Sequence, residues 1–170
     1  MTRVASFYNC VNSKQIPNFT DWFAREDGVI SNPHRQTIRG SRNKDGYCCY
    51  IDPGGGQHYI HRLVAKTWIF NKRPDIFKEV DHINGIKHDN RVANLRWSNR
   101  TIQNLNRDFK GWEYNPRWKK YKAQCIVHGV KHKLGWFKTS AEAHSSYVSF
   151  KNKKIQEIYD YYYNEPGSTG

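Results

Sequence analysis

The sequence lacks any apolar run that approaches the roughly 18–20 residues of a membrane-spanning helix. Its first fifteen residues contain no apolar segment of the kind that a secretory signal requires. It also contains no internal repeat. We therefore expect a non-repetitive cytoplasmic protein that acts inside the cell and does not contact a membrane.

Cysteine is scarce, and its four copies are poorly spaced for zinc. Cys10, Cys48, Cys49 and Cys125 include no pair separated by two residues, and two adjacent cysteines cannot easily bind one tetrahedral ion. We therefore expect no structural zinc, and we expect free thiols in a reducing compartment.

Acidic residues are few as well: 15 Asp and Glu stand against 28 Lys and Arg, which gives a formal net charge of +13. Such a surplus indicates a polyanionic partner, either nucleic acid or an anionic membrane surface. Because no membrane segment is present, nucleic acid is the favoured partner. The aromatic content of 15% suits both a small β-rich core and contacts with bases or sugars.

Turn signals divide residues 22–69 into short strands followed by a helix. The Asp-Gly dipeptides at 27–28 and 45–46 are hairpin signals, and residues 53–56 form a loop of proline and glycines. Apolar residues recur at near-helical spacing in residues 61–69, which predicts a short amphipathic helix there.

A second helix is predicted at residues 98–109, capped by Ser98 or Asn99. The predicted apolar face of this helix contains Ile102, Leu105 and Phe109.

Residues 111–153 have a different pattern. Alternating side chains predict strands at 120–127 and 130–137, with a turn between them. A capping box of Thr139 and Glu142 opens a helix at 139–154. The pattern predicts a sheet with one helix packed across it, and no burial pattern follows Tyr163.

The stretch "VDHINGIKHDNRVANLRW" (80–97) concentrates groups that bind metals or transfer protons. Asp81 and His82 end a short predicted strand, Gly85 permits a reversal, and Asn94 lies on the returning segment. One interpretation is a solvated polar turn, in which Asn and Asp serve turn chemistry. The other is an active site for phosphodiester hydrolysis.

The chemistry of these residues fits the second interpretation. Asp81 and an Asn on the following helix supply the oxygen ligands that a hard divalent cation needs. His82 can take a proton from water because the pKa of imidazole lies near neutrality. Asn94 can hold the histidine ring in the required tautomer.

This stretch resembles the HNH motif of homing endonucleases encoded in phage and organellar group I introns. The upstream segment "FAREDGVISN…GYCCYIDPGGGQHYIHRLVAKTWI" resembles the hairpin module that precedes the motif in the same enzymes. The resemblance implies a ββα-metal fold and one Mg²⁺ or Mn²⁺ ion. It also implies that Asp81 is a metal ligand, His82 the general base and Asn94 the residue that orients it.

The second metal ligand is ambiguous. In the family an Asn on the helix usually lies six residues after the position of Trp97, which here is Gln103. Asn104 follows one residue later, and a one-residue insertion within 98–102 would bring it into register. We favour Asn104, because Gln is a poor substitute for a short, rigid Asn ligand.

Residues 111–153 are similar to the DNA-binding domain of plant ethylene-response factors, in which three antiparallel strands carry one helix. The matching features include Gly111, Trp118, the strand pair and the sequence Leu-Gly-Trp-Phe at 134–137. The resemblance implies that this sheet contacts DNA. The side chains expected to bind DNA are Arg96, Arg117, Lys119, Lys120, Lys122, Lys131, Lys133 and Trp136.

The expected fold class is α+β. It comprises an N-terminal hairpin module (1–75), a ββα-metal core (76–110), a C-terminal three-stranded antiparallel sheet with one packed helix (111–155) and a tail (156–170). The expected function is metal-dependent, site-specific cleavage of double-stranded DNA. A monomer that nicks one strand is expected, because one Asp-His…Asn constellation is present and no heptad stripe indicates a dimer. The alternative is a DNA-binding protein that keeps an inactive HNH module.

Overall fold

The computed structural model describes residues 12–32, 34 and 36–164, which form two compact units. The first unit comprises Met1–Asn71 and Val80–Trp97, and the second comprises Lys72–Glu79 and Ser98–Gly170. Small antiparallel sheets and a few helices make up both units, so the expected α+β class is confirmed. Among the described helices, none is both long enough and apolar enough to cross a membrane.

Two small sheets open the first unit. The four-stranded sheet has the order β1 (Ser13–Gln15), β2 (Phe23–Arg25), β3 (Ile30–Ser31), β4 (Thr37–Ile38), and the three-stranded sheet the order β5 (Ser41–Arg42), β6 (Cys48–Ile51), β7 (Gln57–Tyr59). Both predicted Asp-Gly hairpins are present. Gly28 and Gly46 have φ angles of 82° and 89°, in the left-handed region that a side chain disfavours.

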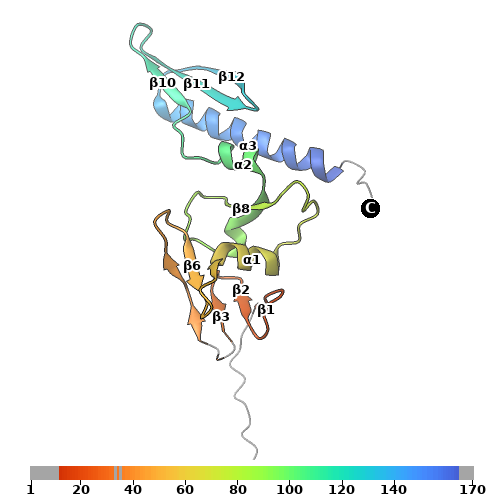
Figure 1. Cartoon of the computed structure of the whole chain (residues 1–170). Coiled ribbons are helices and arrows are strands. Elements are labelled where there is room, and N and C mark those ends of the chain that lie inside the picture. Colours follow the sequence, from red (N-terminus) through yellow and green to blue (C-terminus); the bar gives the residue numbers. More distant parts are fainter. Residues whose placement is uncertain (1–11, 33, 35, 165–170) are drawn as a thin grey trace, which may run out of the picture. The chain divides into compact units, whose positions relative to one another are not determined.

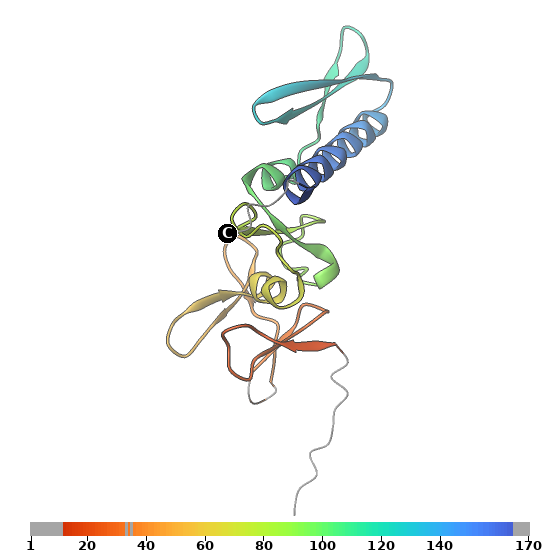
Figure 2. The ribbon, with the colours of Figure 1, turned by 90° about the vertical axis from the view of Figure 1, so that its right-hand side faces the viewer.

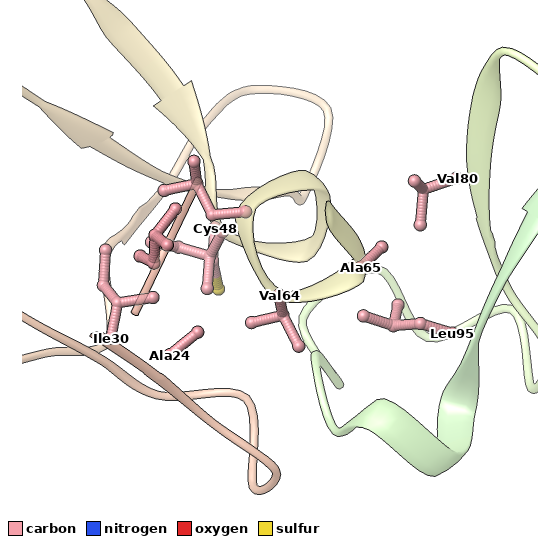
Figure 3. Packing of buried hydrophobic residues seen from close by; sticks show 10 residues of the cluster. Ala24, Ile30, Cys48, Val64, Ala65, Val80 and Leu95 are labelled. Carbon is pink, nitrogen blue, oxygen red and sulfur yellow. The ribbon is translucent and has the colours of Figure 1, made fainter. Parts of the chain in front are cut away.

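Helix α1 (Ile60–Trp68) carries the core of the first unit. Figure 3 shows α1 between Ala24, Ile30 and Cys48 of the hairpins on one side and Val80 and Leu95 on the other. These side chains are almost entirely shielded from solvent. Burying apolar surface on both sides of one helix fixes the strand that carries Asp81 and His82 relative to the hairpins.

The predicted order of strand, loop, strand and helix follows. It consists of β8 (Glu79–His82), the 3₁₀ turn η1 (Val92–Asn94), β9 (Leu95–Ser98) and helix α2 (Arg100–Leu105), with β8 paired to β9. Asn99 caps α2 by accepting a hydrogen bond from the amide of Ile102 at 3.0 Å. The prediction that α2 continues to Phe109 is wrong: the helix ends at Leu105, and Phe109 is 60% exposed.

The second unit contains a three-stranded sheet and a long helix. The sheet has the order β10 (Trp112–Asn115), β11 (Lys120–Val127), β12 (Val130–Phe137), and helix α3 (Ser140–Asn164) follows it. Figure 2 shows α3, in blue, lying along this sheet. The two longest strands have the predicted bounds. The capping box is also confirmed, because Thr139 Oγ1 accepts from the amide of Glu142 and Glu142 Oε2 accepts from that of Thr139.

Helix α3 is longer than predicted and does not end near residue 154 (Figure 1). Its last turns pack on Phe77, a fully buried residue distant in the sequence. The Phe77 ring lies 5.1–5.7 Å from the rings of Tyr159, Tyr162 and Tyr163. These contacts supply the apolar burial that stabilises the last turns of the helix. The local sequence pattern did not predict them, because Phe77 is distant in the sequence.

Gly28 lies directly against the loop that follows β8. A Cβ atom at Gly28 would lie 2.5 Å from the carbonyl oxygen of Asn90 and 2.8 Å from the amide nitrogen of Arg91. Both neighbours are backbone atoms, which cannot move aside as a flexible side chain can. Gly55 has a similar φ of 85° but nothing within 4 Å of its Cβ position.

Alanine substitutions at Gly28 and Gly55 distinguish the energetic cost of steric overlap from the cost of backbone strain. We expect Gly55→Ala to cost about 1 kcal/mol through its left-handed φ. Gly28→Ala should cost about 1–3 kcal/mol more, because the added methyl group forces backbone apart. Urea unfolding of both variants measures the difference, and equal costs would contradict the close approach.

Candidate active site

The predicted site residues divide between the units. Asp81 and His82 lie at the end of β8, and Asn94 ends η1, all in the first unit. Gln103 and Asn104 lie on α2 in the second unit, the former half-buried and the latter exposed.

His82 is buried, with 4% of its surface exposed, and its ring is held by an amide. Nε2 lies 3.2 Å from Oδ1 of Asn90. Since a carbonyl oxygen can only accept, this contact places the proton on Nε2 and the lone pair on Nδ1. Burial lowers the pKa of His82 below its usual 6.5, although Asn90 and Asp81 oppose the shift, so the ring is neutral at pH 7.

Other rings confine the imidazole of His82. The rings of His61 and Tyr47 lie 5.0 and 6.0 Å from it, centroid to centroid, and 5.1 Å from each other. Burial lowers the pKa of His61 to about 3, so this second histidine is also neutral. Its Nδ1 atom is buried and lacks a hydrogen-bond partner among the described residues. His61 is therefore a packing neighbour of His82 and carries no charge beside it.

Asn94 braces the loop that carries Asn90. Its Oδ1 accepts from the amide of Asn84 at 3.0 Å, and its Nδ2 donates to the carbonyl of Asp89 at 2.8 Å. Its own carbonyl accepts from the amide of Ile83. Both ends of the Asn94 amide therefore bind backbone groups of this loop, and its role in orienting His82 stays a prediction. Asn90 contacts the His82 ring directly.

Asp81 forms an ion pair with Arg96 on the neighbouring strand β9. Nε and Nη2 of Arg96 donate to Oδ2 of Asp81 at 3.0 and 2.7 Å. Only 12% of the Asp81 side chain and 19% of the Arg96 side chain are exposed. Arg96 therefore lies against the carboxylate, and its expected contact with phosphate stays a prediction.

The first-unit residues have the chemical character of a hydrolytic site. A neutral imidazole with a defined tautomer can accept a proton, and it adjoins a carboxylate in sequence and at the end of one strand. Asp81 is a hard oxygen donor of the kind that Mg²⁺ and Mn²⁺ bind. Within the described ranges, no three His, Cys, Asp or Glu side chains gather as a metal-binding group.

The sheet of the second unit gathers most of the residues predicted to bind DNA. Ala123, Cys125 and Val127 are buried on the face of β11 that contacts α3, so the alternate residues face away from it. Directly paired residues of two strands share one face of the sheet. The β12 residues opposite Lys122, Gln124 and Ile126 therefore also lie on the face away from α3. The face away from α3 therefore carries Lys120, Lys122, Lys131, Lys133 and Trp136. We call these five residues the lysine face.

Arg117 and Lys119 lie beside this face, in the turn of residues 116–119. In the same turn, Trp118 is 54% exposed and its ring lies 4.6 Å from that of Trp136.

Residues 74–105 match the family model of HNH endonucleases. Over 90 residues the chain is 40% identical to the HNH endonuclease L247 of Acanthamoeba polyphaga mimivirus, covering 49% of this chain and 23% of that protein. It is 33% identical over 89 residues to L245 of the same virus, covering 51% and 26%. The chain thus spans about a quarter of the length of these relatives. Within it, residues 74–105 are similar to HNH endonuclease domains.

Among solved structures, the chain is similar to the HNH homing endonuclease I-HmuI, described as binding and cleaving DNA. The identity is 27%, the match covers 56% of each chain, and the TM-score is 0.48.

Asn90 is the site residue that the sequence did not identify. The stretch 80–97 contains three asparagines, Asn84, Asn90 and Asn94, and spacing alone does not show which side chain reaches the ring. In the sequence, Gly28 was recognisable only as part of a hairpin turn. Its backbone contact with Asn90 depends on tertiary packing and therefore could not identify Asn90.

We expect Asn90→Ala to release the tautomer of His82. Without the Oδ1 acceptor, Nε2–H loses its partner, and ¹⁵N chemical shifts of the ring should show an increased Nδ1–H population. Asn84→Ala is the matched control, because Asn84 lies in the same loop but its side chain binds Asp89 and Ile86. An unchanged tautomer ratio in Asn90→Ala would show that another group fixes the ring.

Proposed function

We propose that this protein is a metal-dependent, site-specific DNA endonuclease of the homing type. The observation that carries the proposal is the buried, neutral His82, oriented by Asn90 beside Asp81 inside the segment that matches HNH endonucleases. Such an imidazole is suited to removing a proton from water at neutral pH.

In this mechanism Asp81 and Asn104 hold one Mg²⁺ or Mn²⁺ ion, with Gln103 as the alternative helix ligand. When bound, the metal supplies charge stabilisation at the scissile phosphate. His82 accepts the proton of the attacking water at Nδ1, while Nε2–H remains bonded to Asn90. Arg96 holds the Asp81 carboxylate in a fixed orientation through its two hydrogen bonds.

DNA recognition is assigned to two surfaces. The lysine face contacts phosphates and base edges, in line with the similarity of residues 111–153 to ethylene-response-factor domains. The N-terminal hairpins hold the duplex near the cut. This division uses the modules proposed at residues 1–75, 76–110 and 111–155, which are followed by the proposed tail at 156–170.

One active site reaches one scissile phosphate at a time, because the two DNA strands run antiparallel. A monomer should therefore nick supercoiled plasmid to open circles before linear product forms. The competing proposal, a DNA-binding protein with an inactive HNH module, retains binding but produces no metal-dependent open circles. The same plasmid assay, with and without Mg²⁺, distinguishes them.

His82→Ala should slow cleavage by at least the roughly 10²-fold that a general base supplies. Affinity for the DNA should remain, because the substitution removes no surface cation. Open-circle formation measures the rate, and filter binding measures affinity. His144→Ala is the control, since His144 is an exposed histidine of α3. Cleavage by His82→Ala at a rate close to wild type would exclude His82 as the base.

The helix ligand can be identified by metal binding as well as by cleavage. We expect Asn104→Ala to lose Mn²⁺ binding in titration calorimetry with uncleaved DNA present, and to lose cleavage with it. Gln103→Ala should have a mild effect on both. The reverse result would assign the ligand to Gln103, in the register that the family usually shows.

A further inference from the structure

A groove of about 630 Å³ in the first unit carries arginines that the proposed reaction does not use. It lies between the hairpins and the loop after β8, and Arg39, Arg42 and Arg91 contribute to its lining. Asn90, the partner of His82, also lines it.

Two close backbone approaches build this groove. Gly28 lies against the backbone of Asn90, as described above. Gly40, with a φ of 72°, would place a Cβ 2.7 Å from the carbonyl oxygen of Cys49. The chain turns at Gly40 between β4 and β5, which positions Arg39 immediately before it and Arg42 shortly after it. Because both approaches involve backbone, the walls of the groove are set by the fold itself.

The charges in the groove are not balanced. Arg91 binds Asp89 through two contacts of 2.7 Å, and this pairing holds the pKa of Asp89 at about 2. Asp27 is likewise bound by Arg25 at 2.7 Å. Within the described part of the chain, Arg39 and Arg42 form no ion pair, and both are exposed. Two guanidinium groups therefore lack an anionic partner.

We infer that this groove binds the sugar–phosphate backbone of the duplex, at phosphates that flank the cut. A guanidinium donates two parallel hydrogen bonds to phosphate oxygens, so Arg39 and Arg42 together suit a phosphate-bearing backbone. Asn90 links the groove to the proposed cleavage site, because its side chain contacts His82 and the same residue lines the groove. The inference rests on the proposed nuclease function and adds a substrate contact to it.

The test measures binding of the full-length protein to a short labelled duplex across a salt series. EDTA is present, and a gel confirms that the DNA stays intact. The variants are Arg39→Gln, Arg42→Gln and the double substitution. Lys153→Gln is the matched control, because Lys153 is an exposed cation of α3, which belongs to neither of the surfaces assigned to DNA.

Each arginine variant should reduce the slope of log K against log salt by about 0.9, and the double variant by about 1.8. Lys153→Gln should leave the slope near the wild-type value. Ethylation interference on the cleaved site should then show phosphates beside the cut that matter for wild type and not for the double variant. An unchanged slope, or affected phosphates remote from the cut, would overturn the inference.

The outcomes also separate this inference from the proposed function. A wild-type protein that binds duplex with the arginine-dependent slope but never cleaves it overturns the nuclease, and it leaves the groove as a backbone site. Cleavage with an unchanged slope in the double variant overturns the groove alone. A slope loss seen only with RNA overturns DNA as the occupant.

Discussion

The contact between Gly28 and the backbone of Asn90 connects the N-terminal hairpins to the chemistry of the loop after β8. Asn90 can orient His82 only if the Asn90 backbone is held at a fixed distance from the ring. The hairpin turn at Gly28 packs on that backbone and holds it in place. Asn94 holds the same loop from the opposite end through Asn84 and Asp89. The position of the imidazole therefore depends on packing between two segments about 60 residues apart in the sequence.

The net charge of +13 is distributed unevenly with respect to the proposed site. Close to the buried ring, charges are matched in pairs, Asp81 with Arg96 and Asp89 with Arg91. His61 and His82 add no charge, since burial lowers the pKa of both. Unmatched cations lie instead on surfaces, such as Arg39 and Arg42 in the groove. In the proposed reaction, this arrangement would attract a polyanion while His82, the proposed base, stays neutral.

Local signals in the sequence predicted local structure well. The Asp-Gly hairpins, the capping box of α3 and the bounds of β11 and β12 all depend on residues a few positions apart. The errors concern tertiary contacts. Helix α3 extends because tyrosines in its last turns pack on Phe77, whereas α2 ends at Leu105 and leaves Phe109 60% exposed. The role of Asn90 belongs to the same class, because a hydrogen bond to His82 requires the folded loop.

Residues 83–94 form one loop that serves three requirements. Its asparagines hold the loop and the imidazole, its backbone packs on Gly28, and Asp89 to Arg91 form one wall of the cationic groove. A phosphate bound in the groove would contact the same short segment that fixes the base. The same loop would then both bind the substrate and position the base. No conformational change would be needed to couple the groove to His82. Because one loop has these several roles, a substitution that shifts its backbone disturbs both the groove and the His82 ring.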